Sequence, residues 1–171
     1  MNNSISPRTS QIHPDIQVRA ATRADLPQIL GMLKQLTEAH AQYDHKRFVA
    51  PSDAASVYGA WDARALPGSD VLALVAQRVD SGRVVGYLIS EHFEAMPKYW
   101  APECIYVHDI FVEAEARKTG AADVLLEHAA IWGQARGVRQ LRGIVANANQ
   151  MGQAFFKRSG FRAGCIEFVR D

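Results

Sequence analysis

The sequence has few cysteines, almost no net charge and no long hydrophobic run. Only two of its 171 residues are cysteine, Cys104 and Cys165, and neither belongs to a CxxC motif or a Cys/His cluster. This excludes a disulfide scaffold and gives no sign of a zinc site. We expect both cysteines to be buried thiols in a reducing compartment. The net charge of +1 argues against a general nucleic-acid or membrane-surface binder.

No segment approaches the roughly 18 apolar residues that a membrane span needs. The first residues carry no apolar run behind a basic start, so they do not predict a secretory signal, and we expect a cytoplasmic protein. Residues 1–14 are polar and contain two prolines, which predicts a flexible N-terminal arm. Residues 15–171 then form a single domain, since hydrophobic residues make up 48% of the chain.

Apolar periodicity predicts alternating strands and helices. Strands are expected at 16–21, 71–79, 83–93, 104–112 and 139–146, helices at 22–40, 53–65, 121–136 and 149–160, and one or two short edge strands over 161–171. Consecutive strands come first and alternate with helices later. The order predicts an α/β fold with a mixed sheet that is antiparallel at the start and has helices on both faces.

The turn between strand 104–112 and helix 121–136 reads Arg117-Lys118-Thr119-Gly120-Ala121-Ala122. The first N–H groups of a helix have no partner within it, and the helix dipole favours an anion beside them. Gly120 lets the backbone approach a ligand closely, and Arg117 and Lys118 add positive charge. The turn is therefore a candidate phosphate site.

Two blocks resemble the Gcn5-related N-acetyltransferase (GNAT) superfamily. The first is Val112-x4-Arg117-x-x-Gly120-x-Ala122, and the second is Asn149-x-x-Gly152-x-x-Phe155-Phe156-x-x-x-Gly160-Phe161. The resemblance covers about 16–168 and is closest to polyamine-type or small-amine acetyltransferases. It implies a GNAT-like acyl-CoA N-acyltransferase fold with a central twisted sheet, in which the parallel strands 104–112 and 139–146 splay apart.

The same resemblance implies that acetyl-coenzyme A is the co-substrate and that no metal is required. Its pantetheine arm would bind along strand 104–112, and its pyrophosphate would lie on the glycine turn. The implied cofactor-binding residues are Ile110, Phe111, Val112, Arg117, Lys118, Thr119, Gly120, Ala121, Ala122, Asn149 and Phe156.

The chemistry calls for a proton acceptor. An alkylamine has a pKa near 10 and cannot attack a thioester while protonated, so a carboxylate is expected to take the proton directly or through water. The candidate catalytic residues are Asp109, Glu91 and His108, with Glu94 as a further base. Strand alternation predicts that Asp109 and His108 point to opposite faces and do not act as a pair.

Phe156 departs from the family pattern, which often has a tyrosine there to protonate the leaving thiolate. Three alternatives remain open: the thiolate leaves unassisted or through water, another group such as Tyr106 or Ser159 protonates it, or catalysis is weak. The phenyl ring keeps the packing beside the thiol.

The leading prediction is an enzyme that acetylates a primary amine of a polyamine, an amino-acid-like amine or an aminoglycoside. The alternatives are a protein N-terminal or lysine acetyltransferase, a non-catalytic acyl-coenzyme A-binding module, and a weakly supported nucleotide-binding protein, because no GxxxxGK[ST] or GxGxxG motif is present. Acceptor specificity is expected in loops 41–66 and 94–103, whose rim aromatics are Tyr43, Phe48, Tyr99 and Trp100. A homodimer is a possible assembly.

Overall fold

The computed structural model describes residues 15–49 and 70–170. The strands are β1 (Ile16–Ala20), β2 (Val71–Arg78), β3 (Val84–Phe93), β4 (Cys104–Val112) and β5 (Leu141–Gly143); the helices are α1 (Leu26–Tyr43), α3 (Ala121–Gln134) and α4 (Gln150–Arg158), with short 3-10 turns at Arg23–Asp25, Pro97–Tyr99 and Ala114–Ala116. The predicted arm at 1–14 and the predicted helix at 53–65 lie outside the described residues.

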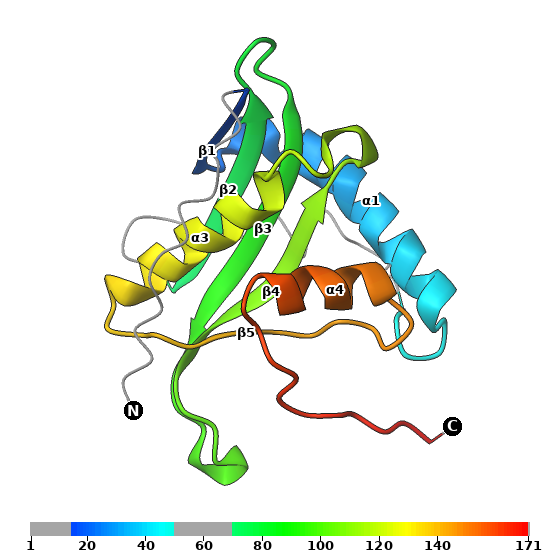
Figure 1. Cartoon of the computed structure of the whole chain (residues 1–171), viewed down its shortest axis with the longest axis vertical. Helices are drawn as coiled ribbons and strands as arrows, with labels where there is room; N and C mark the ends of the chain where they lie inside the picture. The colour runs from blue at the N-terminus through cyan, green and yellow to red at the C-terminus, as the bar shows by residue number, and fades with distance from the viewer. Residues whose placement is uncertain (1–14, 50–69, 171) are drawn as a thin grey trace.

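One sheet has the strand order β1-β2-β3-β4-β5. Every neighbouring pair is antiparallel except β4 and β5, which are parallel. The sheet lies between α1 on one face and α3 on the other (Figure 1). The mixed sheet with helices on both faces is therefore confirmed.

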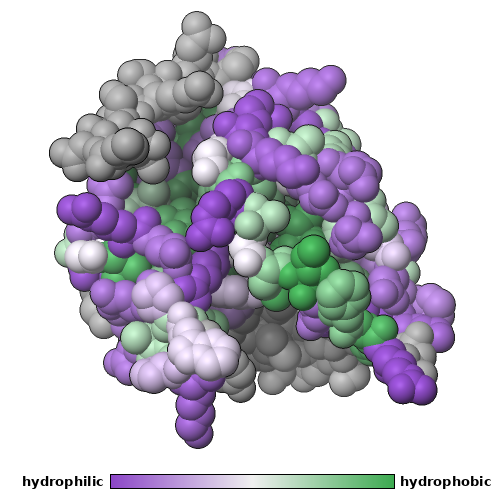
Figure 2. Space-filling view, turned by 60° about the horizontal axis from the view of Figure 1, so that its bottom comes forward, coloured by the Kyte–Doolittle hydropathy of each residue, from purple (hydrophilic) through white to green (hydrophobic). Residues whose placement is uncertain are grey.

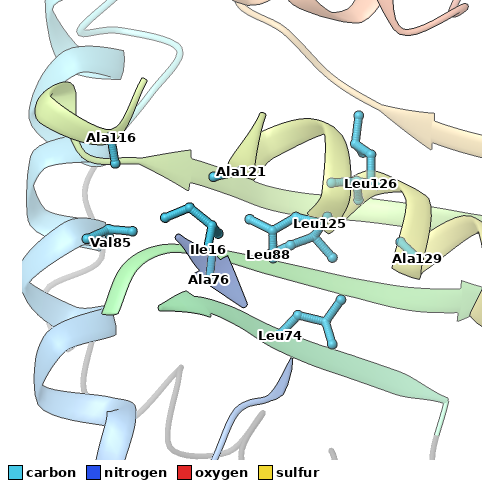
Figure 3. Close-up of a cluster of buried hydrophobic side chains, with 11 residues drawn as sticks. Ile16, Leu74, Ala76, Val85, Leu88, Ala116, Ala121, Leu125, Leu126 and Ala129 are labelled. Carbon is cyan, nitrogen blue, oxygen red and sulfur yellow. The ribbon is translucent and has the colours of Figure 1, made fainter. Parts of the chain in front are cut away.

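Two hydrophobic clusters hold these layers together. On the α3 face, Leu125 and Ala129 of the helix pack with Leu88 and Ala76 of the strands (Figure 3). On the α1 face, Met32 and its helical neighbours pack on strand residues that include Tyr87 and Ile89. The apolar spacing that predicted both helices is the spacing that buries them.

Helix ends and two strand predictions need correction. α1 runs to Tyr43 rather than His40, and α3 ends at Gln134 rather than 136. The strand expected at 139–146 is only Leu141–Gly143, and Ile144 beyond it is 60% exposed. No strand forms over 162–170, although its apolar residues suggested one, because a strand needs ladder partners and this segment pairs with none of the strands described.

Both cysteines were expected to be buried; Cys104 is buried, but Cys165 is exposed. Cys104 lies in β4, inside the sheet, whereas Cys165 lies in the segment that forms no strand. No helix within 15–49 or 70–170 is long and apolar enough to cross a bilayer.

Asp25 ties the start of α1 to the sheet. Its carboxylate accepts hydrogen bonds from two guanidinium nitrogens of Arg19 at 2.7 Å each, and from the backbone N–H and hydroxyl of Thr22 at 2.8 and 2.9 Å. Arg19 also donates to Gln77 of β2 at 2.7 Å. The Arg19 hydrogen bond lowers the pKa of the buried Asp25 carboxyl from 3.8 to about 2.

We predict that Asp25→Ala lowers the free energy of unfolding at pH 7 by about 2–3 kcal/mol, because it leaves Arg19 and the Thr22 N–H without their partner. Asp80→Ala is the control: Asp80 binds Arg78 at 2.6 Å but its side chain is 60% exposed, so little change is expected. Urea unfolding measures both.

The pH dependence follows from the lowered pKa of Asp25. A carboxyl whose pKa is lower in the folded state stabilises the fold above its unfolded pKa, and this contribution is lost as pH falls through 3.8 toward about 2. The stability gap between wild type and Asp25→Ala should narrow over that window. An equal gap at pH 7 and near pH 2 would contradict this account.

Candidate active site

The parallel strands β4 and β5 separate soon after they meet. Their pairing runs from Ile105 opposite Leu141 to Val107 opposite Gly143 and then stops. β4 continues to Val112, with no strand beside it on that edge in the described part of the chain. We call residues 108–112 of β4 the open edge. The predicted splay is therefore present, and it begins at Val107.

The hydrogen bonds of β4 identify which open-edge groups are available. Glu113 N–H donates to Val85 O of β3 at 2.9 Å, so by strand alternation Phe111 also faces β3. The Phe111 carbonyl indeed lies on that side, 2.9 Å from where a Cβ on Gly86 would be. Ile110 and Val112 therefore direct their backbone groups to the open side. Arg117 Nε already donates to Val112 O at 3.2 Å.

The glycine turn after β4 has the shape expected of an anion site. Gly120 is the N-cap of α3 with φ 85°, and Lys118 also has a positive φ of 66°. Thr119 Oγ1 donates to Ala116 O at 2.8 Å, which stabilises the turn. The left-handed conformations of Lys118 and Gly120 can direct successive backbone N–H groups to one side of the turn. These groups would lie beside the positive end of the α3 dipole, where an anion is favoured.

A β-bulge in β4 changes which side chains share a face. Ile89 pairs with Asp109 and Ser90 pairs with Val107, so His108 is the extra residue. The expectation that Asp109 and His108 point to opposite faces is therefore wrong. A bulge interrupts alternation, and both residues are directed to the α1 side: His108 bonds to Glu91, and Asp109 lies opposite Ile89 of the α1 cluster.

Glu91 and His108 form the central polar pair of this face. His108 Nε2 lies 3.2 Å from Glu91 Oε2, and both side chains are about one-fifth exposed, at 22% and 18%. Phe93 stacks on Tyr106 with ring centroids 5.1 Å apart, and each ring meets His108 edge-on, at 5.7 and 5.1 Å. We call Phe93, Tyr106 and His108 the ring wall. Sequence reasoning missed Phe93, although it lies two residues after Glu91 in β3 and therefore on the same face of the sheet.

Phe156 of α4 lies where the two strands separate. Its ring packs between Phe155 and Phe161 and would be 3.8 Å from a Cβ on Gly143, the last residue of β5. Asn149 caps α4, since its Oδ1 accepts the N–H of Gly152 at 2.8 Å.

Of the groups suggested to replace the family tyrosine, Ser159 is bonded to Phe155 O at 3.0 Å and faces Asp123 of α3. Tyr106 lies in the ring wall, where burial raises the pKa of its phenol.

The remaining sequence candidates are scattered. Glu94 and Trp100 are exposed beyond the end of β3, and Tyr43 and Phe48 pack with His40 at the end of α1. Asp44 caps the turn after α1, where its Oδ1 accepts two backbone N–H groups. Residues 15–49 and 70–170 contain no cluster of three or more His, Cys, Asp or Glu side chains that could hold a metal ion.

Comparison with known proteins gives a family. The acetyltransferase (GNAT) family profile matches residues 33–161. No match was found among curated proteins.

Several solved structures share the fold. A tetramutant of the BH1408 protein from Bacillus halodurans is 19% identical with a TM-score of 0.77, over 91% of this chain and 99% of its own. Aminoglycoside N-acetyltransferase AAC(6')-Iy in complex with CoA is 21% identical with a TM-score of 0.70, over 98% and 99%. Glucosamine-6-phosphate N-acetyltransferase from Arabidopsis thaliana is 13% identical with a TM-score of 0.68, over 91% and 97%.

Whether the turn binds the phosphates of coenzyme A can be tested by substituting two matched glycines. Gly120 and Gly137 flank α3 and have φ values of 85° and 80°. We predict that alanine at either position costs about 1 kcal/mol of stability, because a Cβ strains a left-handed backbone. Only Gly120→Ala should also weaken coenzyme A binding in calorimetric titration, by about tenfold or more, since only that turn bears the N–H groups. Equal binding by both variants would show that the turn is not the phosphate site.

Proposed function

Because the chain belongs to the acetyltransferase (GNAT) family, which uses acetyl-coenzyme A as co-substrate, we propose that it acetylates a primary amine of a small molecule. The observation that carries this proposal is the open edge of β4. It has a left-handed glycine turn suited to an anion at one end and the Glu91–His108 pair at the other. Donor recognition and proton transfer can therefore be served by a single strand and its neighbours.

The residues present fit the donor. The N–H and C=O groups of Ile110 and the N–H of Val112 would hold an extended amide-containing arm as a neighbouring strand would. The N–H groups from Lys118 to Ala122, with the side chains of Arg117 and Lys118, would hold its diphosphate. Bound acetyl-coenzyme A supplies a thioester carbonyl that an amine can attack.

Glu91 is our choice of proton acceptor. Its carboxylate is half-buried, and His108 fixes one of its oxygens at 3.2 Å. A positioned carboxylate can take the proton of an incoming ammonium group directly or through one water molecule. His108 has the role of a positioning residue, and Asp109 adds a second carboxyl group on the same side of the bulge.

The acceptor we propose is a polyamine, an amino-acid-like amine or an aminoglycoside. Carboxylates beside an aromatic wall suit a compact cation, which is attracted to both. Aminoglycoside N-acetyltransferase AAC(6')-Iy has the same fold and supports the last class. A protein N-terminus or lysine is the second candidate, and a non-catalytic acyl-coenzyme A-binding module is the third. Coenzyme A release with small amines, but not with peptides, would select the first.

We also propose that residues 15–171 act as one acetyltransferase domain in a cytoplasmic homodimer. The exposed free thiol of Cys165 fits a reducing compartment. Ile166 and Phe168 are 78% and 90% exposed, and a second copy would remove them from water. Light scattering should give twice the 18.9 kDa chain mass; a monomer mass would contradict the dimer.

The base is tested by Glu91→Gln. We expect kcat/KM for the amine to fall about 10²–10⁴-fold, because the amide cannot take a proton, while coenzyme A binding stays unchanged. Glu94→Gln is the matched control, since Glu94 is exposed and lies three residues further along the chain. Equal losses in both variants, or no loss in Glu91→Gln, would remove Glu91 from this role.

Phe156→Tyr tests whether an acid is needed to protonate the departing thiolate. A phenol at the strand fork would be placed to protonate the departing thiolate, so we expect kcat to rise, by up to about 10²-fold if this proton limits turnover. Phe155→Tyr controls for an added hydroxyl on the neighbouring ring. An unchanged kcat with intact coenzyme A binding would mean that the thiolate needs no acid here.

A further inference from the structure

The chain around the glycine turn carries more acidic than basic side chains. From the end of β4 to the first turn of α3 it has three carboxylates, Glu113, Glu115 and Asp123, and only two cationic side chains, Arg117 and Lys118. The segment proposed to hold a diphosphate therefore has an excess of negative charge. Charges within about 10 Å of each other are only partly screened at ordinary ionic strength, so these carboxylates would repel a bound anion.

Arg83 adds a positive charge from a distant part of the sequence. It directly precedes β3, and its Nη2 lies 2.5 Å from Glu113 Oε2 while its Nη1 lies 2.6 Å from Glu115 Oε1. One guanidinium group thus binds two carboxylates, each through a different nitrogen. In Figure 1 the turn between β2 and β3 lies at the top of the molecule, in the same part as the segment that follows β4. With Arg83 counted, acidic and basic side chains around the glycine turn balance.

The two carboxylates bound by Arg83 lie close to the glycine turn. Glu115 is three residues before Lys118, and three residues span at most roughly 11 Å even when fully extended. The actual chain is more compact, because Glu115 is part of a 3-10 turn. Ala116 links the two parts: its N–H donates to Glu113 O at 2.9 Å, and its carbonyl oxygen accepts the Thr119 hydroxyl at 2.8 Å. An anion at the turn would therefore be within range of both carboxylates.

We propose that Arg83 is a determinant of coenzyme A binding, because it neutralises the two carboxylates that would otherwise repel the diphosphate. The inference rests on the proposed acetyltransferase function and adds a residue to its donor site. Arg83 acts through Glu113 and Glu115 and needs no contact with the ligand, so its role is that of a positioning residue.

The two ion pairs contribute little to the stability of the fold. The side chains of Arg83 and Glu115 are 50% and 59% exposed, and exposed ion pairs have small effects on the free energy of unfolding. The Glu113 side chain is less exposed, at 20%, but its backbone N–H also donates to Val85 O of β3. This hydrogen bond keeps the segment attached to the sheet when Arg83 is replaced. The effect of Arg83 is therefore expected in ligand binding rather than in folding.

Arg83 is far from the proposed acceptor site. Glu91 lies eight residues further along the chain in β3, which corresponds to roughly 26 Å at about 3.3 Å per residue. Figure 2 turns toward the viewer the other end of the molecule, which carries the connection between β3 and β4, and hydrophobic and hydrophilic residues lie side by side there. Over that distance the charge of Arg83 is screened. Its loss should raise the KM for acetyl-coenzyme A and leave the KM for the amine unchanged.

The first arm of the test is calorimetric titration with acetyl-coenzyme A at low and at high salt. For Arg83→Gln we expect the dissociation constant to rise about three- to tenfold at low salt, and by less at high salt, because salt screens the repulsion. Arg83→Lys keeps the charge and should stay within about twofold of wild type. Arg78→Gln is the matched control and should leave binding unchanged: it removes the same charge from the same hairpin, but its partner is Asp80, at 2.6 Å.

The second arm separates the charge of Arg83 from a mechanical role. In the triple variant Arg83→Gln/Glu113→Gln/Glu115→Gln the repelling carboxylates are also removed, so binding should return to the wild-type level or become tighter. A mechanical role predicts no such recovery, because amides do not restore the ion pairs. Glu113→Gln/Glu115→Gln with Arg83 intact leaves the guanidinium charge uncompensated and should tighten binding about three- to tenfold at low salt. This variant tests the inference even if Arg83→Gln does not fold.

The outcomes distinguish this inference from the function on which it rests. Folded wild type that binds no acetyl-coenzyme A would overturn both the proposed donor site and the role of Arg83. Wild-type binding with equal dissociation constants in Arg83→Gln and Arg78→Gln would overturn the role of Arg83 alone. So would a loss in Arg83→Gln that the triple variant does not recover, binding no tighter in Glu113→Gln/Glu115→Gln than in wild type, or an equal rise in the KM for the amine.

Discussion

The early end of the pairing between β4 and β5 is the constraint on which the site depends. Only three residues of β5 pair with a strand of nine. The bulge at His108 comes directly after the last residue of β4 that pairs with β5, and the ring of Phe156 lies beside Gly143, where β5 ends. Backbone groups that a longer β5 would satisfy are left facing an opening. An extended ligand could pair with the Ile110 and Val112 backbone groups as a neighbouring strand would.

The same bulge organises the polar chemistry. It places His108 and Asp109 on one side of the sheet, with His108 against Glu91, where simple alternation would separate the two side chains. The turn that follows β4 lies at the start of α3, which covers the opposite face. On the proposed function, the opening between the strands would connect the candidate anion-binding turn on one face with the Glu91–His108 pair on the other. Under that proposal, donor and acceptor would reach one point from opposite faces of the sheet.

Much of the fold could be predicted from the sequence because it rests on local patterns. The helical spacing of Leu125 and Ala129, and the run Cys104–Val112, gave elements that the structure confirms. Other features depend on partners distant in the sequence. The bulge at His108 is set by the register with β3, and the early end of β5 and the state of 162–170 depend on which segments pair in the sheet. No periodicity could indicate that Phe93 would stack on Tyr106.

The central claim is that the open edge of β4 binds acetyl-coenzyme A, and amide hydrogen exchange tests it most directly. Ile110 and Val112 direct their N–H groups to the open side, whereas Phe111 faces β3. Saturating coenzyme A should slow exchange at Ile110 and Val112 and leave Phe111, already paired, nearly unchanged. Protection of the turn at Lys118–Ala122 should accompany it. Tight binding without protection of Ile110 and Val112 would show that the ligand occupies another site.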